Sequence, residues 1–130
     1  MQYPLALLLL GHGFIYVRIG PTAARTVKDW SGRSWLLGDA ITGEYLTSLV
    51  ATLHVLAGVL FLACAAAIAI SSSLAGWWPP LAIAGAVIGI AAFAVFWDGQ
   101  TRLLFEEGVA GALISLLLLA SAIAFPDAFA

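Results

Sequence analysis

Charged side chains are scarce in this sequence. They make up 9% of its 130 residues, whereas soluble domains carry about 25%. Together with 63% hydrophobic residues and a mean hydropathy of +1.07, this scarcity excludes an ordinary soluble domain and predicts an integral membrane protein. Because apolar segments occupy nearly the whole chain, we expect a single transmembrane domain, residues 1–130, without a separate soluble domain.

Cysteines, clustered basic residues and familiar catalytic patterns are also scarce or missing. The single cysteine, Cys64, excludes an intramolecular disulfide. The net charge of −2 and the lack of a basic patch argue against a nucleic-acid partner. No Cys–His or Ser–His–Asp pattern has convincing spacing, and no glycine-rich phosphate loop follows a strand. We therefore do not expect the chain to be an enzyme acting alone.

The sequence does contain four long apolar stretches, bounded by proline, glycine and serine. They predict an all-α fold, an integral membrane four-helix bundle, because each is long enough, or nearly so, to cross a hydrocarbon core of about 30 Å. No basic residue precedes the first stretch, so we expect a retained span and not a cleaved signal peptide. The expected spans are Pro4–Ile19, Tyr45–Ile70, Trp78–Trp97 and Arg102–Phe125.

The basic residues all fall on one side of these spans. By the positive-inside rule, the first loop (Gly20–Glu44) and the third loop (Asp98–Thr101) face the cytoplasm and both termini lie outside. A prokaryotic plasma membrane is the expected location. The first loop is long, and within it Thr22–Trp30 and Ser34–Ile41 are predicted to be short interfacial helices. The basic residues on this side are Arg18, Arg25, Lys28, Arg33 and Arg102.

A small-residue motif marks the third span. Gly85 and Gly89 form a GxxxG pattern, which lets two helix backbones approach closely. Gly108 and Ala112 form a second small-xxx-small pair in the fourth span. Packing inside the bundle and a dimer face would both use such residues, so a homo-oligomer stays open as an alternative.

Two histidines lie in the first two spans, and their positions predict that they meet. If Ile19 and Tyr45 end neighbouring antiparallel spans at the same level, His12 and His54 differ in depth by only about 3 Å. Ionisable groups within a span are costly and usually face the interior or a cavity. We therefore expect both imidazoles to point inward, either toward a ligand or into interhelical hydrogen bonds such as one from His12 to Thr52.

Other polar side chains gather in the same half of the predicted bundle. Tyr16 shares a helix face with His12, and Thr47 shares one with His54. Glycines on both sides of His12 leave space for a flat ligand, or for close packing of helices. The predicted ligand-binding residues are His12, Tyr16, Thr47, His54 and Glu106.

A polar pocket beside an apolar interior suits an amphipathic ligand, so we expect a protein that binds a lipid or a quinone. Two histidines on facing helices also permit bis-histidine ligation of a b-type haem. His12, His54 and Glu106 together would offer three metal ligands. A small transporter unit that works as an oligomer is a further hypothesis. Membrane lipids are the expected partners.

The architecture of the whole chain resembles the DoxX-like group of small four-span membrane proteins. The segments that prompt the resemblance are Leu7–Gly13, Gly32–Gly38 and the stretch from Phe96 to Gly108. The resemblance implies a four-span fold and a role as an accessory or redox-linked subunit of a larger membrane complex, coupled to quinones in sulfur oxidation or in the redox-stress response. It carries over no catalytic residue to this chain.

Overall fold

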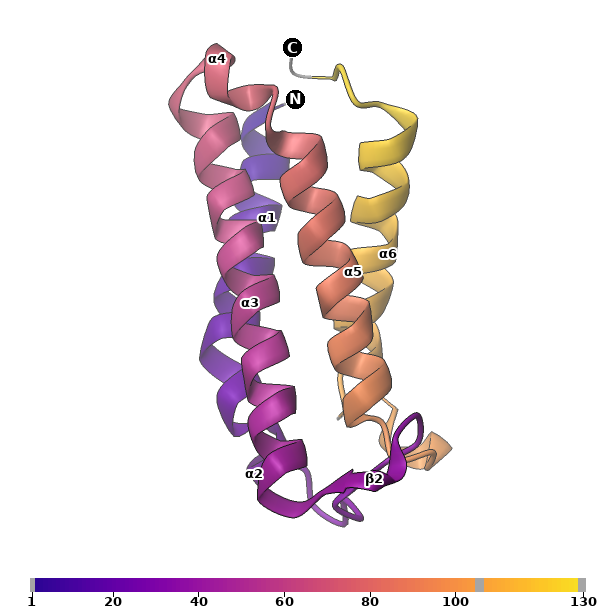
Figure 1. Ribbon diagram of the computed structural model, residues 1–130. Helices are drawn as coiled ribbons and strands as arrows, with labels where there is room; N and C mark the ends of the chain where they lie inside the picture. The colour runs from indigo at the N-terminus through magenta and orange to yellow at the C-terminus, as the bar shows by residue number, and fades with distance from the viewer. Residues whose placement is uncertain (1, 105–106, 129–130) are drawn as a thin grey trace.

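Four long helices run side by side in alternating directions in the structure, a computed structural model that describes residues 2–104 and 107–128 (Figure 1). They are α1 (Gln2–Ile19), α3 (Gly43–Ile70), α5 (Trp78–Phe96) and α6 (Val109–Ala124). Short elements join them: η1 (Gly20–Thr22), α2 (Ala23–Thr26), β1 (Arg33–Ser34), β2 (Gly38–Thr42), α4 (Ser72–Ala75) and η2 (Thr101–Leu103).

The two ends of this assembly differ in character. The start of α1 and the end of α6 lie at the same end as α4, and the two loops with most of the charge lie at the other end (Figure 1). The latter is termed the charged end, because all five basic residues lie in these loops or, like Arg18, in the adjoining helical turn. The expected grouping of the first and third loops on one side is therefore present.

The chain is predominantly helical, as expected from its apolar runs. Three helical segments are long and apolar enough to cross a membrane, namely Gln2–Thr26, Gly43–Ile70 and Ser73–Phe96. The fourth, Val109–Ala124, is shorter, and its 16 residues span about 24 Å.

The predicted fourth span, Arg102–Phe125, is wrong at its start. The chain forms a 3₁₀ turn at Thr101–Leu103, and the helix begins only at Val109. Gly108 has a φ of 103°, a left-handed conformation that an α-helix cannot contain. The carboxyl of Glu107 is therefore placed in a loop and not on a helix face, and Glu106 falls outside the described residues.

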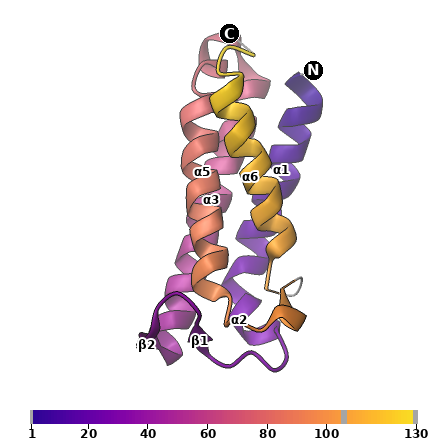
Figure 2. The same ribbon diagram turned by 90° about the vertical axis from the view of Figure 1, so that its right-hand side faces the viewer.

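The first loop also departs from the expected pair of interfacial helices. Only Ala23–Thr26 is helical in the first predicted segment, and the second forms a β-hairpin in which Arg33 pairs with Thr42. The hydroxyl of Ser34 accepts the amide hydrogens of Leu36 and Leu37, which fixes a turn in place of a helix. The hairpin lies beneath α3 and α5 in Figure 2.

Tryptophans attach this hairpin to the helices. The Trp35 amide donates a 2.7 Å hydrogen bond to the carbonyl of Trp97, and the two indole rings lie 5.4 Å apart. Nearby, Trp30 Nε1 donates to the Phe96 carbonyl. Polar ends and apolar rings of this kind suit a boundary between an apolar phase and water.

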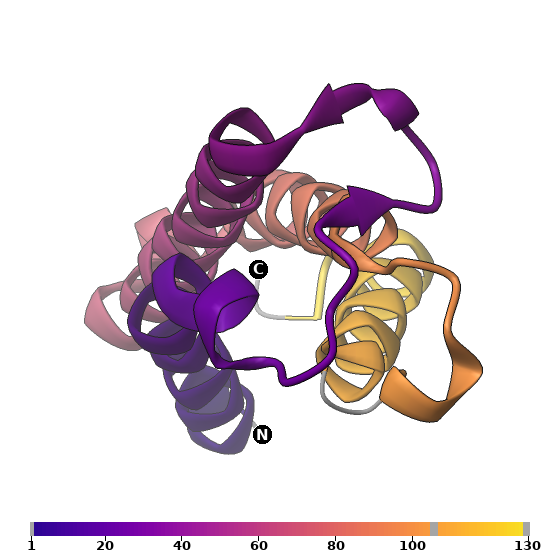
Figure 3. The ribbon, with the colours of Figure 1, turned by 90° about the horizontal axis from the view of Figure 1, so that it is seen from below.

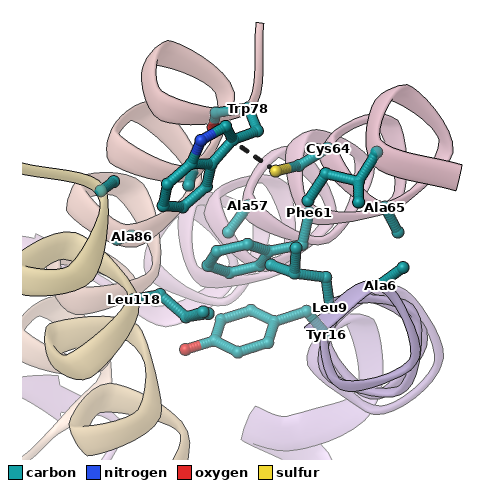
Figure 4. Packing of buried hydrophobic residues seen from close by; sticks show 13 residues of the cluster. Ala6, Leu9, Tyr16, Ala57, Phe61, Cys64, Ala65, Trp78, Ala86 and Leu118 are labelled. Atoms are coloured by element: carbon teal, nitrogen blue, oxygen red, sulfur yellow. Dashed lines mark hydrogen bonds between the residues drawn. The ribbon is translucent and has the colours of Figure 1, made fainter. Parts of the chain in front are cut away.

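The helices pack in chain order, α1 on α3, α3 on α5 and α5 on α6 (Figure 3). Between α1 and α6, few backbone positions of the described residues come close. The main apolar core fills the space between the helices toward the end that carries α4, and Figure 4 shows Leu9, Phe61, Trp78 and Leu118 within it. Cys64 is fully buried there, and its thiol donates to the Trp78 carbonyl.

The GxxxG residues of α5 face this interior. A Cβ added to Gly85 would lie 3.0 Å from the ring of Phe61, and one added to Gly89 would lie 3.0 Å from both Ser115 Oγ and the Tyr16 hydroxyl. Packing within the chain therefore accounts for the motif, and a dimer face would have to use other residues.

Candidate functional site

A cavity of about 120 Å³ lies between the helices near the charged end. Its polar wall consists of Tyr16 from α1, His54 from α3 and Glu107 from the loop before α6. The exposed apolar side chains of Ile15 (52%) and Ile19 (54%) also line it, so its opening lies on the outer surface of α1. The remaining lining residues are Gly20, Phe93, Gly108 and Gly111.

The contact between α1 and α3 sets the depth of the two histidines, and it corrects the expected equal depth. A Cβ on Gly20 would overlap the Cβ of His54, so these two backbones are opposite each other. His12 precedes Gly20 by eight residues, so its backbone lies about 12 Å farther from the charged end than the backbone of His54. The prediction failed because α3 begins well beyond the last residue of α1, so Ile19 and Tyr45 are not level.

Tyr16 lies between the two imidazoles and contacts both. Its ring is 4.8 Å from that of His12 and 5.4 Å from that of His54. Figure 4 shows its hydroxyl directed toward α6. There it lies 3.3 Å from Ser115 Oγ. Tyr16 thus lies between two polar regions, one with His12 and Ser115 and the other with His54 and Glu107.

On the side away from the charged end, His12 is hydrogen-bonded to a residue of α6. It is only 5% exposed, and its Nε2 lies 3.1 Å from the fully buried Ser115 Oγ. The serine hydroxyl can accept from one neighbour and donate to the other, so it satisfies both His12 and Tyr16. The expected alternative of an interhelical bond is thus present, with Ser115 as the partner. Thr52, suggested from the sequence, instead donates to the Ser48 carbonyl of its own helix.

On the other side of Tyr16, His54 lines the cavity. Its Nδ1 is 2.7 Å from the Val50 carbonyl. A carbonyl only accepts hydrogen bonds, so Nδ1 carries the hydrogen. In the neutral imidazole, Nε2 is then a bare acceptor. Among the described residues no protein group donates to it.

Glu107 brings a carboxyl group to the same cavity. The residue is 1% exposed, and its Oε2 accepts a 3.0 Å hydrogen bond from the Asp98 amide. The Asp98 carboxylate accepts in turn from the Ser31 amide and from the Gln100 amide and side chain. Burial tends to raise the pKa of the Asp98 carboxyl, but these bonds, with one from the Glu107 side chain, hold that pKa below its ordinary value.

The structure thus brings together Tyr16 and His54 at the cavity, but not the whole predicted set. Thr47 does not line it, and its hydroxyl donates to the Gly43 carbonyl. His12 lies beyond Tyr16, and Glu106 falls outside the described residues.

Two residues of the site were missed in the sequence. Ser115 continues a stripe of small residues from Gly108 and Gly111, and this spacing was the available signal. Glu107 was not among the predicted ligand-binding residues, which included its neighbour Glu106. It is buried directly before Gly108, whose positive φ has no apolar pattern in the sequence to announce it.

The haem and metal hypotheses do not fit this arrangement. The backbones of His12 and His54 differ in depth by about two helical turns, the Tyr16 ring contacts both imidazoles, and Nε2 of His12 is already bonded to Ser115. Within the described part of the chain, no three His, Cys, Asp or Glu side chains are grouped as metal ligands. Comparisons with protein-family models, curated proteins and solved structures give no match for this chain.

Proposed function

We propose that the chain is an integral membrane four-helix bundle that binds the head of an amphipathic, lipid-like or quinone-like ligand in the cavity of Tyr16, His54 and Glu107. The observation that carries this proposal is the cavity itself, because space beside buried polar groups is costly unless a ligand or water fills it. Where a polar side chain bonds directly to a neighbouring helix, as His12 Nε2 does to Ser115 Oγ, that bond needs no such space.

The position of the opening supports an amphipathic ligand. Ile15 and Ile19 lie at the rim with more than half of each side chain exposed. In a bilayer these side chains would face acyl chains, so a ligand could enter sideways from the membrane. Its head would meet Tyr16 and His54 while its tail stayed among the lipids.

The proposed orientation places the cavity on the cytoplasmic side. All five basic residues lie at or next to the charged end, and the positive-inside rule assigns that end to the cytoplasm. We also propose that the chain is related to the DoxX-like group, which would make it an accessory or redox-linked subunit.

A bulky residue at the opening tests the proposal. Ile15→Trp should block the cavity, whereas Leu117→Trp introduces the same ring at a 68% exposed position of α6 outside the cavity. Each protein is purified in mild detergent, and the co-purifying amphiphiles are quantified by mass spectrometry. The wild type and Leu117→Trp should retain the same molecule, and Ile15→Trp should retain about tenfold less. Equal retention by all three, or no specific amphiphile with the wild type, would overturn the proposal.

A further inference from the structure

We infer that the cavity selects a compact, uncharged head group that donates a hydroxyl hydrogen bond to Nε2 of His54. This inference rests on the proposed function and specifies the chemistry of its ligand. Two kinds of membrane molecule carry such a head, a hydroquinone with its ring hydroxyls and a diacylglycerol with its free glycerol hydroxyl.

The size of the cavity limits the head. Pockets that enclose a drug-sized ligand measure about 300–1,000 Å³, so a cavity of about 120 Å³ cannot hold a whole amphiphile. An engineered cavity of about 150 Å³ in another protein binds benzene. The present cavity is somewhat smaller, so a single six-membered ring is the upper limit for the enclosed part of the head, and the tail must leave over Ile15 and Ile19.

The charges around the cavity disfavour an anionic head. No lysine or arginine lines it among the described residues. Arg18 is exposed, and Arg102 donates to the Gln100 side chain. The N-terminus of α6, which favours negative charge, already has the Glu107 carboxyl directly before Gly108. A phosphate in the cavity would therefore lie beside a carboxyl group, and no lysine or arginine of the lining would offset its charge.

The hydrogen-bond state of His54 determines what the head must offer. Because Nδ1 donates to the Val50 carbonyl, the neutral ring presents only an acceptor to the cavity. A head with a hydroxyl satisfies this acceptor. A head with carbonyl oxygens alone leaves it unpaired, which is the costly arrangement for a buried polar atom. The site should therefore distinguish a hydroquinone from its own quinone.

That pair of molecules provides the test, because they differ little besides the hydroxyl hydrogens. Binding of a short-chain hydroquinone, the matching quinone, a short-chain diacylglycerol and phosphatidylglycerol is measured by calorimetry on the protein in nanodiscs, without oxygen. The wild type should bind the hydroquinone about tenfold more tightly than the quinone. Tight diacylglycerol binding with weak hydroquinone binding would support a hydroxyl donor to His54 and identify the glycerol hydroxyl as that donor.

Three variants connect this preference to His54. His54→Leu should remove it, whereas His54→Gln, which keeps an acceptor, should retain part of it. Thr47→Val, on the same helix but outside the cavity, should leave it unchanged. Equal binding of quinone and hydroquinone by the wild type, tighter binding of phosphatidylglycerol, or an unchanged preference in His54→Leu would overturn the inference. The proposed function would survive these results if a specific amphiphile still co-purified, and would fail if none did.

Discussion

Each of the two regions on either side of Tyr16 contains one histidine, and the surroundings of the two histidines differ. His12 is buried against a neighbouring helix, where its Nε2 is hydrogen-bonded to Ser115 Oγ. His54 is satisfied at one nitrogen by its own helix, through the Val50 carbonyl, and turns the rest of its ring to a cavity. A histidine in an apolar helix is therefore informative about binding only when the space beside it is known.

Glycine has opposite effects in the two regions. At Gly89 it makes room for the Tyr16 hydroxyl and Ser115 Oγ, so the first region is tightly filled. At Gly108 it places the chain in a left-handed turn that holds Glu107 at the wall of the cavity. We therefore test the first region by adding volume at Gly89, and the second by changing the groups that a ligand would contact.

The largest effect on stability is expected from Gly89→Leu. The new side chain would collide with Ser115 Oγ and the Tyr16 hydroxyl, and overpacking of this kind costs about 3 kcal/mol. Gly11→Leu is the matched control, since a Cβ at Gly11 meets nothing within 4 Å. Unfolding in mixed detergent–SDS micelles, followed by circular dichroism, measures both. Equal stability of the two variants would mean that the region around Ser115 is not tightly packed.

A smaller loss is expected from Ser115→Ala. This change leaves His12 Nε2 and the Tyr16 hydroxyl without their shared partner, at a cost of about 1–2 kcal/mol. Ser121→Ala removes a hydroxyl of the same helix that bonds only to the Leu117 carbonyl, and should change stability by less than about 0.5 kcal/mol. The same unfolding assay compares them. If the two variants lose the same stability, the hydrogen bonds of Ser115 to His12 and Tyr16 contribute nothing specific to stability.

The smallest effect concerns the loops of the charged end, where Asp98 accepts a hydrogen bond from the Ser31 amide. Its pKa is below the ordinary 3.8. The contact is thus fully present above that value and is lost as the pH falls through the lower pKa of the folded state. Asp98→Asn should weaken the contact at neutral pH by less than about 1 kcal/mol.

Hydrogen exchange of the segment around Ser31 measures this contact. Exchange should be faster in Asp98→Asn than in Asp39→Asn, whose carboxylate forms only an exposed ion pair with Arg33. Equal protection in the two variants would show that Asp98 does not anchor the first loop.

The sequence predicted the four long helices well, apart from the start of the fourth, because apolar runs end at residues that stop a helix, as at Ser71 and before Pro126. It predicted the depth of the histidines poorly, because numbering alone does not say that α3 extends past the end of α1. The β-hairpin was missed because its turn depends on the Ser34 hydroxyl bonding two amides, a contact without apolar periodicity.

The candidate site was predictable only in part, for the same physical reason. Tyr16 and His54 stood out as polar groups in apolar helices. Whether such a group is satisfied depends on a partner from another helix, as Ser115 is for His12. The space left beside His54 depends on the packing of α1, α3, α5 and the start of α6 together, which no single segment reveals.

Nitrogen-15 spectroscopy of the histidine rings tests the central claim most directly, because the chain contains only two histidines. The protein is labelled with ¹⁵N-histidine, reconstituted in nanodiscs and titrated with the short-chain hydroquinone. The Nε2 signal of His54 should start at the position of an unprotonated nitrogen and move on binding, while both nitrogens of His12 stay in place. Movement of the His12 signals with those of His54 unchanged would contradict the assignment of the cavity as the binding site.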